Sequence, residues 1–111
     1  MDEKTLKNKI ENQKRELEIT REELDFYKRQ KPIKEKINKL SIEKNKKKEP
    51  IYEFEEDTDY WRLNADYAKI ENEKEMRAYE RKIEQLEKHI SDGEERIANW
   101  EEQMNEVNQD E

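Results

Sequence analysis

The stretch MRAYERKIEQLEKHISDGEERIANWEEQMNEV, which spans residues 76–107, decides the fold of this chain. Apolar residues recur in it at alternating steps of three and four residues, across more than four heptads. A helix with this spacing presents one narrow apolar stripe, as the helices of coiled coils do. The stripe consists of Met76, Tyr79, Ile83, Leu86, Ile90, Gly93, Ile97, Trp100, Met104 and Val107.

Gly93 is the position of this stripe at which the helix is most easily interrupted. Ser91 and Glu94 have the spacing of a capping box, and a glycine often ends a helix. The heptad phase nevertheless continues through Gly93 without a shift. The sequence therefore predicts one continuous helix that is weakened at Gly93.

The N-terminal segment carries a second heptad pattern. Ile10, Leu17 and Leu24 recur every seven residues, and the complementary column is half polar, with Leu6, Gln13, Thr20 and Tyr27. Pro32 follows, and proline costs a helix interior about 3 kcal/mol. We therefore expect a kink or break near residues 30–31, after which Ile33, Ile37 and Leu40 resume the pattern as a short helix.

A loop is expected between these two segments. Pro50 and the run Asp57-Thr58-Asp59 are typical of loops, and Asp57 or Thr58 is the expected N-cap of the following helix. That helix would begin its stripe with Tyr60, Leu63, Tyr67 and Ile70. The predicted helices are 3–30, 33–46 and 58–107, with a loop tip at about 48–57.

The two patterns can pair in an antiparallel register. If Ile10 lies opposite Trp100, then Leu17 lies opposite Gly93 and Leu40 opposite Ile70, and each pair of numbers sums to 110. The centre of the turn is then residue 55, inside the expected loop. We predict a single all-α domain, an elongated antiparallel helical hairpin or coiled coil, with a four-helix bundle as its dimer. Pairing of the helices between chains stays open.

The composition excludes several classes of protein. Only 30% of the 111 residues are hydrophobic and 50% are charged, so the chain cannot enclose a thick core. It has no cysteine, no glycine-rich phosphate loop and one histidine, His89, which we expect at the surface. Without a core there is no place to exclude water around a reaction. We predict a protein that is not an enzyme and that uses no cofactor or metal.

The chain also lacks the features of a secreted or membrane protein. Its N-terminus is charged from the second residue and has no apolar signal region. No apolar run approaches the about 18–20 residues of a membrane helix. We expect a soluble, cytoplasmic protein that does not bind membranes.

The stretch IYEFEEDTDYW, residues 51–61, is the first candidate binding site. It holds four of the nine aromatic residues and no basic residue. Aromatic side chains ringed by acids could dock into a pocket of a basic partner protein; alternatively, the rings only close the end of the hairpin. The candidate partner-binding residues are Tyr52, Phe54, Glu55, Glu56, Asp57, Asp59, Tyr60 and Trp61.

The charge distribution gives two further candidates. Residues 28–48 carry ten Lys or Arg against two acids, and the densest patch is Lys44, Lys46, Lys47 and Lys48. Such a tract can bind phosphates, but it lacks the aromatics of nucleic-acid sites and can equally be a solvated face. Residues 83–111 carry ten acids and two bases, and such rows of carboxylates can imitate a nucleic-acid backbone.

These patterns favour a coiled-coil module that binds a partner protein through the tip aromatics or the helix faces, and that self-associates into a homo-oligomer. The identity of the partner does not follow from the sequence. The alternative is an acidic inhibitor of a nucleic-acid-binding protein, as in conflict between a bacterium and its phage. Direct binding of nucleic acid through residues 28–48 is a lesser alternative.

Overall fold

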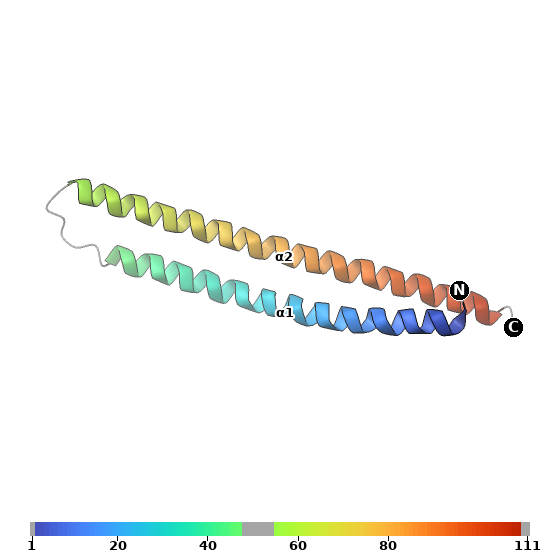
Figure 1. Ribbon diagram of the computed structural model, residues 1–111. Coiled ribbons are helices and arrows are strands. Elements are labelled where there is room, and N and C mark those ends of the chain that lie inside the picture. Colours follow the sequence, from blue (N-terminus) through green and yellow to red (C-terminus); the bar gives the residue numbers. More distant parts are fainter. Residues whose placement is uncertain (1, 48–54, 110–111) are drawn as a thin grey trace. The chain divides into compact units, whose positions relative to one another are not determined.

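The computed structural model describes residues 2–47 and 55–109, and side-chain positions within them for 2–44 and 62–107. Two helices account for almost all of this part: α1 is Glu3–Lys47 and α2 is Glu55–Gln109 (Figure 1). The predicted all-α hairpin is thus confirmed.

The chain divides into two compact units, and both helices run through both of them. The terminal unit combines Met1–Phe26 with Lys82–Glu111, and the central unit is Tyr27–Arg81. In each unit a segment of α1 packs antiparallel against a segment of α2.

Most of the apolar core lies in the terminal unit. Leu6, Ile10, Leu17 and Leu86 are at most 7% exposed there. A Cβ placed on Gly93 would lie only 2.5 Å from Leu17 Cδ2, so these two residues face each other as the register predicts. Gly93 is buried inside α2, which runs through it without a break. The glycine thus lets the two helices approach closely, and the prediction of a continuous helix is confirmed.

The same register holds in the central unit. The Asn38 side-chain amide donates to Asn72 Oδ1 at 2.8 Å, and their numbers again sum to 110. An asparagine in the seam of a coiled coil favours one register, because any other alignment would bury its amide without a partner. Asn38 therefore helps to fix the alignment in the unit where Met76 alone is buried among the described side chains.

Of the kink or break expected near residues 30–31, the break is wrong, because α1 is a single helix with Pro32 inside it. Pro32 is exposed, so water can hydrate the carbonyl oxygen that the proline ring leaves without an N–H donor. The helix is also held to α2 close to Pro32, through ion pairs of Lys31 with Glu80 and of Lys34 with Glu75. These contacts help to keep the segment helical.

The continuity of α1 overturns a second prediction. The column of Ile10, Leu17 and Leu24 continues with the same seven-residue step to Lys31 and Asn38, which face α2. Ile33, Ile37 and Leu40 are turned away and are 54–61% exposed. Leu63, Tyr67 and Ile70 of α2 are 60–68% exposed. The predicted Leu40–Ile70 layer is therefore wrong.

The start of α2 also differs from its prediction. The helix begins at Glu55 rather than Thr58, so Asp57 and Thr58 lie within it and neither is its N-cap. Glutamate favours helices, and acidic residues in the first turn interact well with the helix dipole. Residues 55–57, which were predicted to belong to the loop tip, are therefore part of α2. The rest of the predicted tip, residues 48–54, lies outside the described part.

Asp2 caps the N-terminus of α1. The backbone N–H of Thr5 donates to Asp2 Oδ1 at 2.8 Å, which satisfies one of the free donors of the first turn. The hydrogen bond from the Thr5 side chain, and then that from its backbone N–H, hold the pKa of the Asp2 carboxyl below its usual value.

The contribution of this cap is expected to depend on pH. A lowered pKa in the folded state means that the cap stabilises the protein fully above the unfolded pKa of about 3.9, and that this contribution is lost as the pH falls through the folded pKa. The difference in thermal stability between the wild type and Asp2→Asn should shrink over this range, and an NMR titration should give Asp2 a lower pKa than in an unfolded peptide. A pH-independent difference would contradict the prediction.

Gln13 is a polar residue in the core of the terminal unit. It is 6% exposed, and its side-chain Nε2 has no hydrogen-bond partner among the described residues. Thr20, in the same column, donates through Oγ1 to the Glu16 carbonyl oxygen at 2.8 Å. The two buried polar side chains therefore differ, since only the threonine hydroxyl is satisfied.

Replacing Gln13 by Met is expected to raise the free energy of unfolding by about 1 kcal/mol, because an unsatisfied buried donor is removed while the length of the side chain is kept. Chemical denaturation followed by circular dichroism measures this. The matched control is Gln103→Met at an exposed position of α2, where we expect a change within about 0.5 kcal/mol. Equal effects at both positions would contradict the prediction.

Candidate interaction surfaces

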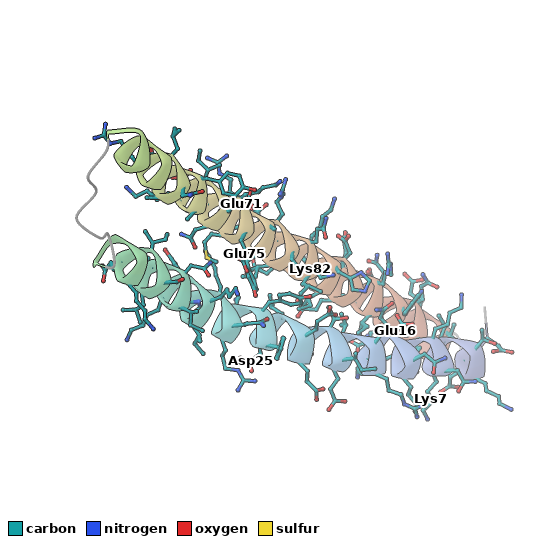
Figure 2. All side chains as sticks on the ribbon, turned by 60° about the vertical axis from the view of Figure 1, so that its left-hand side comes forward. Lys7, Glu16, Asp25, Glu71, Glu75 and Lys82 are labelled. Atoms are coloured by element: carbon teal, nitrogen blue, oxygen red, sulfur yellow. The ribbon has the colours of Figure 1, made fainter. Side chains whose placement is uncertain are left out.

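The seam between the helices of the central unit is polar. Lys31 Nζ lies 3.1 Å from Glu80 Oε1, and Lys34 Nζ lies 3.7 Å from Glu75 Oε1. Asn38 donates to Glu75 Oε2 at 3.0 Å in addition to Asn72. Figure 2 shows Glu75 on the side of α2 that faces α1.

Apolar contacts are few in this seam. Met76 is the only buried residue among the described side chains of the central unit. Tyr27 and Tyr79 meet edge to face, with ring centroids 6.1 Å apart and an interplanar angle of 64°. The seam therefore buries little large apolar surface beyond Met76 and these two rings.

Six large apolar side chains of the central unit lie on its outside instead. Ile33, Ile37 and Leu40 follow a four-three spacing and form the α1 outer face. Leu63, Tyr67 and Ile70 follow the same spacing on the other helix and form the α2 outer face. Each face is a short apolar stripe of the kind that a partner helix covers.

A groove borders the α2 outer face. Its volume is about 570 Å³, and Asn38 and Ile42 of α1 line it together with Tyr67, Ala68, Asn72 and Ala78 of α2. The alanines leave room between the helices, while Tyr67 contributes both to the groove and to the outer face.

The tip residues cannot be assigned a surface. Tyr52 and Phe54 lie outside the described residues. Glu55, Glu56, Asp57, Asp59, Tyr60 and Trp61 belong to the first two turns of α2, where the structure describes the helix and not the side chains. Their role in binding a partner stays a prediction.

The basic tract is partly engaged within the chain. Lys31 and Lys34 face α2 and pair with glutamates, and Lys39 pairs with Glu35 at 3.3 Å within α1. Lys44 is exposed, Lys46 and Lys47 belong to the last turn of α1, and Lys48 lies outside the described part. Fewer cations are therefore available to phosphates than the sequence indicates.

The acidic segment of α2 is also partly paired. Glu94 Oε1 lies 2.7 Å from Arg21 Nη2, and Glu101 Oε1 lies 3.8 Å from Lys14 Nζ. All four side chains are about half exposed, so each pair adds little stability. The pairs do interrupt the row of carboxylates that imitation of nucleic acid requires.

His89 is exposed, as the sequence predicts. No group of three or more His, Cys, Asp or Glu side chains that could hold a metal ion occurs among the described residues. No helix in residues 2–47 and 55–109 is long and apolar enough to cross a membrane.

Comparison with known proteins found no matching family model, no matching curated protein and no matching solved structure.

The outer faces were missed as binding surfaces by the sequence analysis, which assigned them to the core. A signal for the α1 outer face does exist, because Ile19, Phe26, Ile33 and Leu40 recur at every seventh residue beside the column of Ile10, Leu17 and Leu24. A helix with two apolar columns has two apolar faces, and α2 packs against only one of them.

Proposed function

We propose that this protein is a non-enzymatic helical module that binds a partner protein through an outer face of its central unit. One observation carries the proposal: six large apolar side chains of this unit are 54–68% exposed, while charged and amide side chains fill the seam between its helices.

The arrangement costs stability unless the outer faces are covered. Burial of apolar surface contributes about 25 cal/mol per Å², and a hairpin optimised only for folding would turn these side chains toward the seam. Clustered apolar residues at a surface mark binding sites more often than isolated ones do. Tyr67 strengthens the α2 outer face, because tyrosine is enriched among the residues that dominate binding energy.

A pull-down from nuclease-treated lysate of the native cell, or of its host, tests the proposal. The wild type is compared with a variant of the α2 outer face, Leu63→Ser/Tyr67→Ser/Ile70→Ser. The matched control is Ile19→Ser, which removes an apolar side chain that is 66% exposed in the terminal unit. Helix content by circular dichroism confirms that all the chains are folded.

One protein captured by the wild type and by the control, and lost by the α2 variant, supports the proposal. Equal capture by all three chains contradicts it for this face. A parallel variant in which Tyr52, Phe54, Tyr60 and Trp61 are changed to Ala then shows whether the tip is the binding site.

A further inference from the structure

We propose that the α2 outer face continues into a row of cations, and that the two together bind a helix of a partner protein whose own contact stripe is apolar in one half and acidic in the other. This inference rests on the proposed function, because it assigns the chemistry of the partner that the α2 outer face takes. All the residues that carry it belong to the central unit.

The α2 outer face is the beginning of a longer stripe. The spacing of four and three residues that starts at Leu63 continues beyond Ile70 without a shift, and its next three positions are all basic. At 100° per residue the six positions fall within about 80° of the helix circumference, so they share one side of α2 over about 27 Å of its length. This α2 stripe consists of Leu63, Tyr67, Ile70, Lys74, Arg77 and Arg81.

The three cations of the α2 stripe are available to a partner. Lys74, Arg77 and Arg81 are exposed, and none of them forms an ion pair with another described side chain. Lys31 and Lys34 of the same unit differ, because they pair with glutamates across the seam. Carboxylates of a docked helix can therefore meet cations that the chain itself does not use.

The spacing of the α2 stripe specifies a helix as the partner. Alternating steps of four and three residues are the pattern that one helix presents to another in a left-handed coiled coil. A partner helix in register places apolar side chains over the α2 outer face and acidic side chains over the two turns that follow it. The groove lined by Tyr67 and Lys74 leaves space for a side chain of that helix at the border between the two halves.

A partner helix fits the α2 stripe better than an anionic membrane does. Helices that lie on membranes carry apolar residues along one face and cations along the opposite face. In α2 the apolar and the basic residues follow one another along the same face, so a flat apolar layer could not cover the whole stripe. Exposed Asp66, Glu71 and Glu73 flank the stripe and would be repelled by anionic lipids.

The flanking acids also determine where the acids of the partner lie. Asp66 and Glu73 lie on one side of the α2 stripe and Glu71 lies on the other, by their positions at 100° per residue. A uniformly acidic helix would bring carboxylates against all three, which opposes association. The acids of the partner are therefore confined to the positions that face the three cations.

Two synthetic helical peptides test the inference. The acidic peptide carries Leu at three successive stripe positions and Glu at the next three, and the control peptide carries Lys in place of the three Glu. Each peptide is also made with its sequence reversed, so that parallel and antiparallel docking are both covered, and circular dichroism confirms that all are helical. Fluorescence anisotropy of the labelled peptides measures their binding to the full chain.

The wild type should bind an acidic peptide at least about tenfold more tightly than its control, because three ion pairs replace three contacts between like charges. The variant Lys74→Glu/Arg77→Glu/Arg81→Glu should reverse this preference. All three positions are exposed, so the variant should keep its helix content.

The matched control variant is Lys36→Glu/Lys44→Glu/Lys69→Glu. It changes the net charge of the chain by the same amount, at exposed positions of the central unit outside the α2 stripe. It should retain the preference of the wild type for the acidic peptide. A reversal in this variant as well would show that only net charge matters, and would overturn the inference.

Other results also overturn the inference. They are absence of binding by any of the helical peptides, equal binding of the acidic and the control peptides, and a preference that the charge-reversed α2 stripe leaves unchanged. Binding to vesicles of phosphatidylcholine and phosphatidylserine, without binding of the peptides, would assign the stripe to a membrane.

Failure of this inference can be told apart from failure of the proposed function. The charge-reversed variant is added to the pull-down beside Leu63→Ser/Tyr67→Ser/Ile70→Ser. A protein that is lost by the serine variant and retained by the charge-reversed variant supports the proposed function and overturns this inference. A protein captured equally by all the chains contradicts the proposed function for the α2 outer face, and this inference fails with it.

Discussion

Replacing Leu17 by Ala is expected to lower the free energy of unfolding of the terminal unit by about 2–5 kcal/mol. Leu17 is 1% exposed and lies against Gly93, so the deleted atoms leave a cavity in a thin core. A glycine has no side chain with which to fill that cavity, which places the expected loss toward the upper part of the range.

The effect is measured by chemical denaturation, with Trp100 as a local reporter. Trp100 belongs to the terminal unit and is half-buried beside Lys9, whose Nζ lies 5.9 Å from the ring centroid. A background in which Trp61 is changed to Phe removes the other tryptophan.

Leu40→Ala is the matched control. The chemical change is the same, but Leu40 is 55% exposed, so its expected effect is within about 0.5 kcal/mol. Similar losses at the two positions would show that the α1 outer face is covered, as in a dimer, or that Leu17 is not the centre of the core. Repeating the measurement at low protein concentration separates these outcomes, because dimer stability depends on concentration.

The pairing of the two helix segments in the terminal unit could be predicted from the sequence, because the apolar residues occupy the heptad positions that face the other helix. Leu6, Ile10 and Leu17 are apolar at the positions where the heptad requires it, and the register follows from aligning them with Trp100 and Gly93. Gln13 and Thr20 were placed in the same column by spacing alone. Both are buried, so position in the repeat outweighs side-chain polarity here.

The central unit was predicted less well, because the heptad positions that face α2 are occupied there by polar residues and the apolar residues lie elsewhere on the helix. The predicted break at Pro32 allowed the phase to restart at Ile33, which placed the apolar residues inside. The helix instead keeps its phase, and Lys31, Lys34 and Asn38 meet acids and amides of α2. Hydrogen bonds between side chains decide this pairing, and their geometry cannot be obtained from hydropathy.

The candidate binding surface consists of apolar residues that the sequence assigned to the core and that the structure leaves exposed. The sequence indicated a binding module, and it directed attention to the aromatics of residues 51–61. The structure adds the two outer faces, which become visible only when the phase of each helix is known. The apolar residues that the sequence assigned to the core are therefore the ones now proposed to bind partners.

Gly93→Ala is expected to lower the free energy of unfolding by about 1–2 kcal/mol, although alanine is the better helix former by about 1 kcal/mol. The added Cβ would lie 2.5 Å from Leu17 Cδ2, 3.1 Å from Leu17 Cγ and 3.0 Å from Gln13 Nε2. Because Leu17 is almost fully buried, its side chain has little room to move, and overpacking of this kind typically costs about 1–3 kcal/mol.

The same substitution in a Leu17→Ala background should have the opposite sign. The shorter side chain removes the two contacts with Leu17, and the flexible end of the Gln13 side chain can shift away from the remaining one. Helix propensity then dominates, and Gly93→Ala should stabilise the protein by up to about 1 kcal/mol. A double-mutant cycle on Leu17 and Gly93 measures this reversal as a coupling of about 2–3 kcal/mol. Additive effects would mean that the helices can separate at Gly93 at no cost, and that the close approach of α1 and α2 does not depend on the glycine.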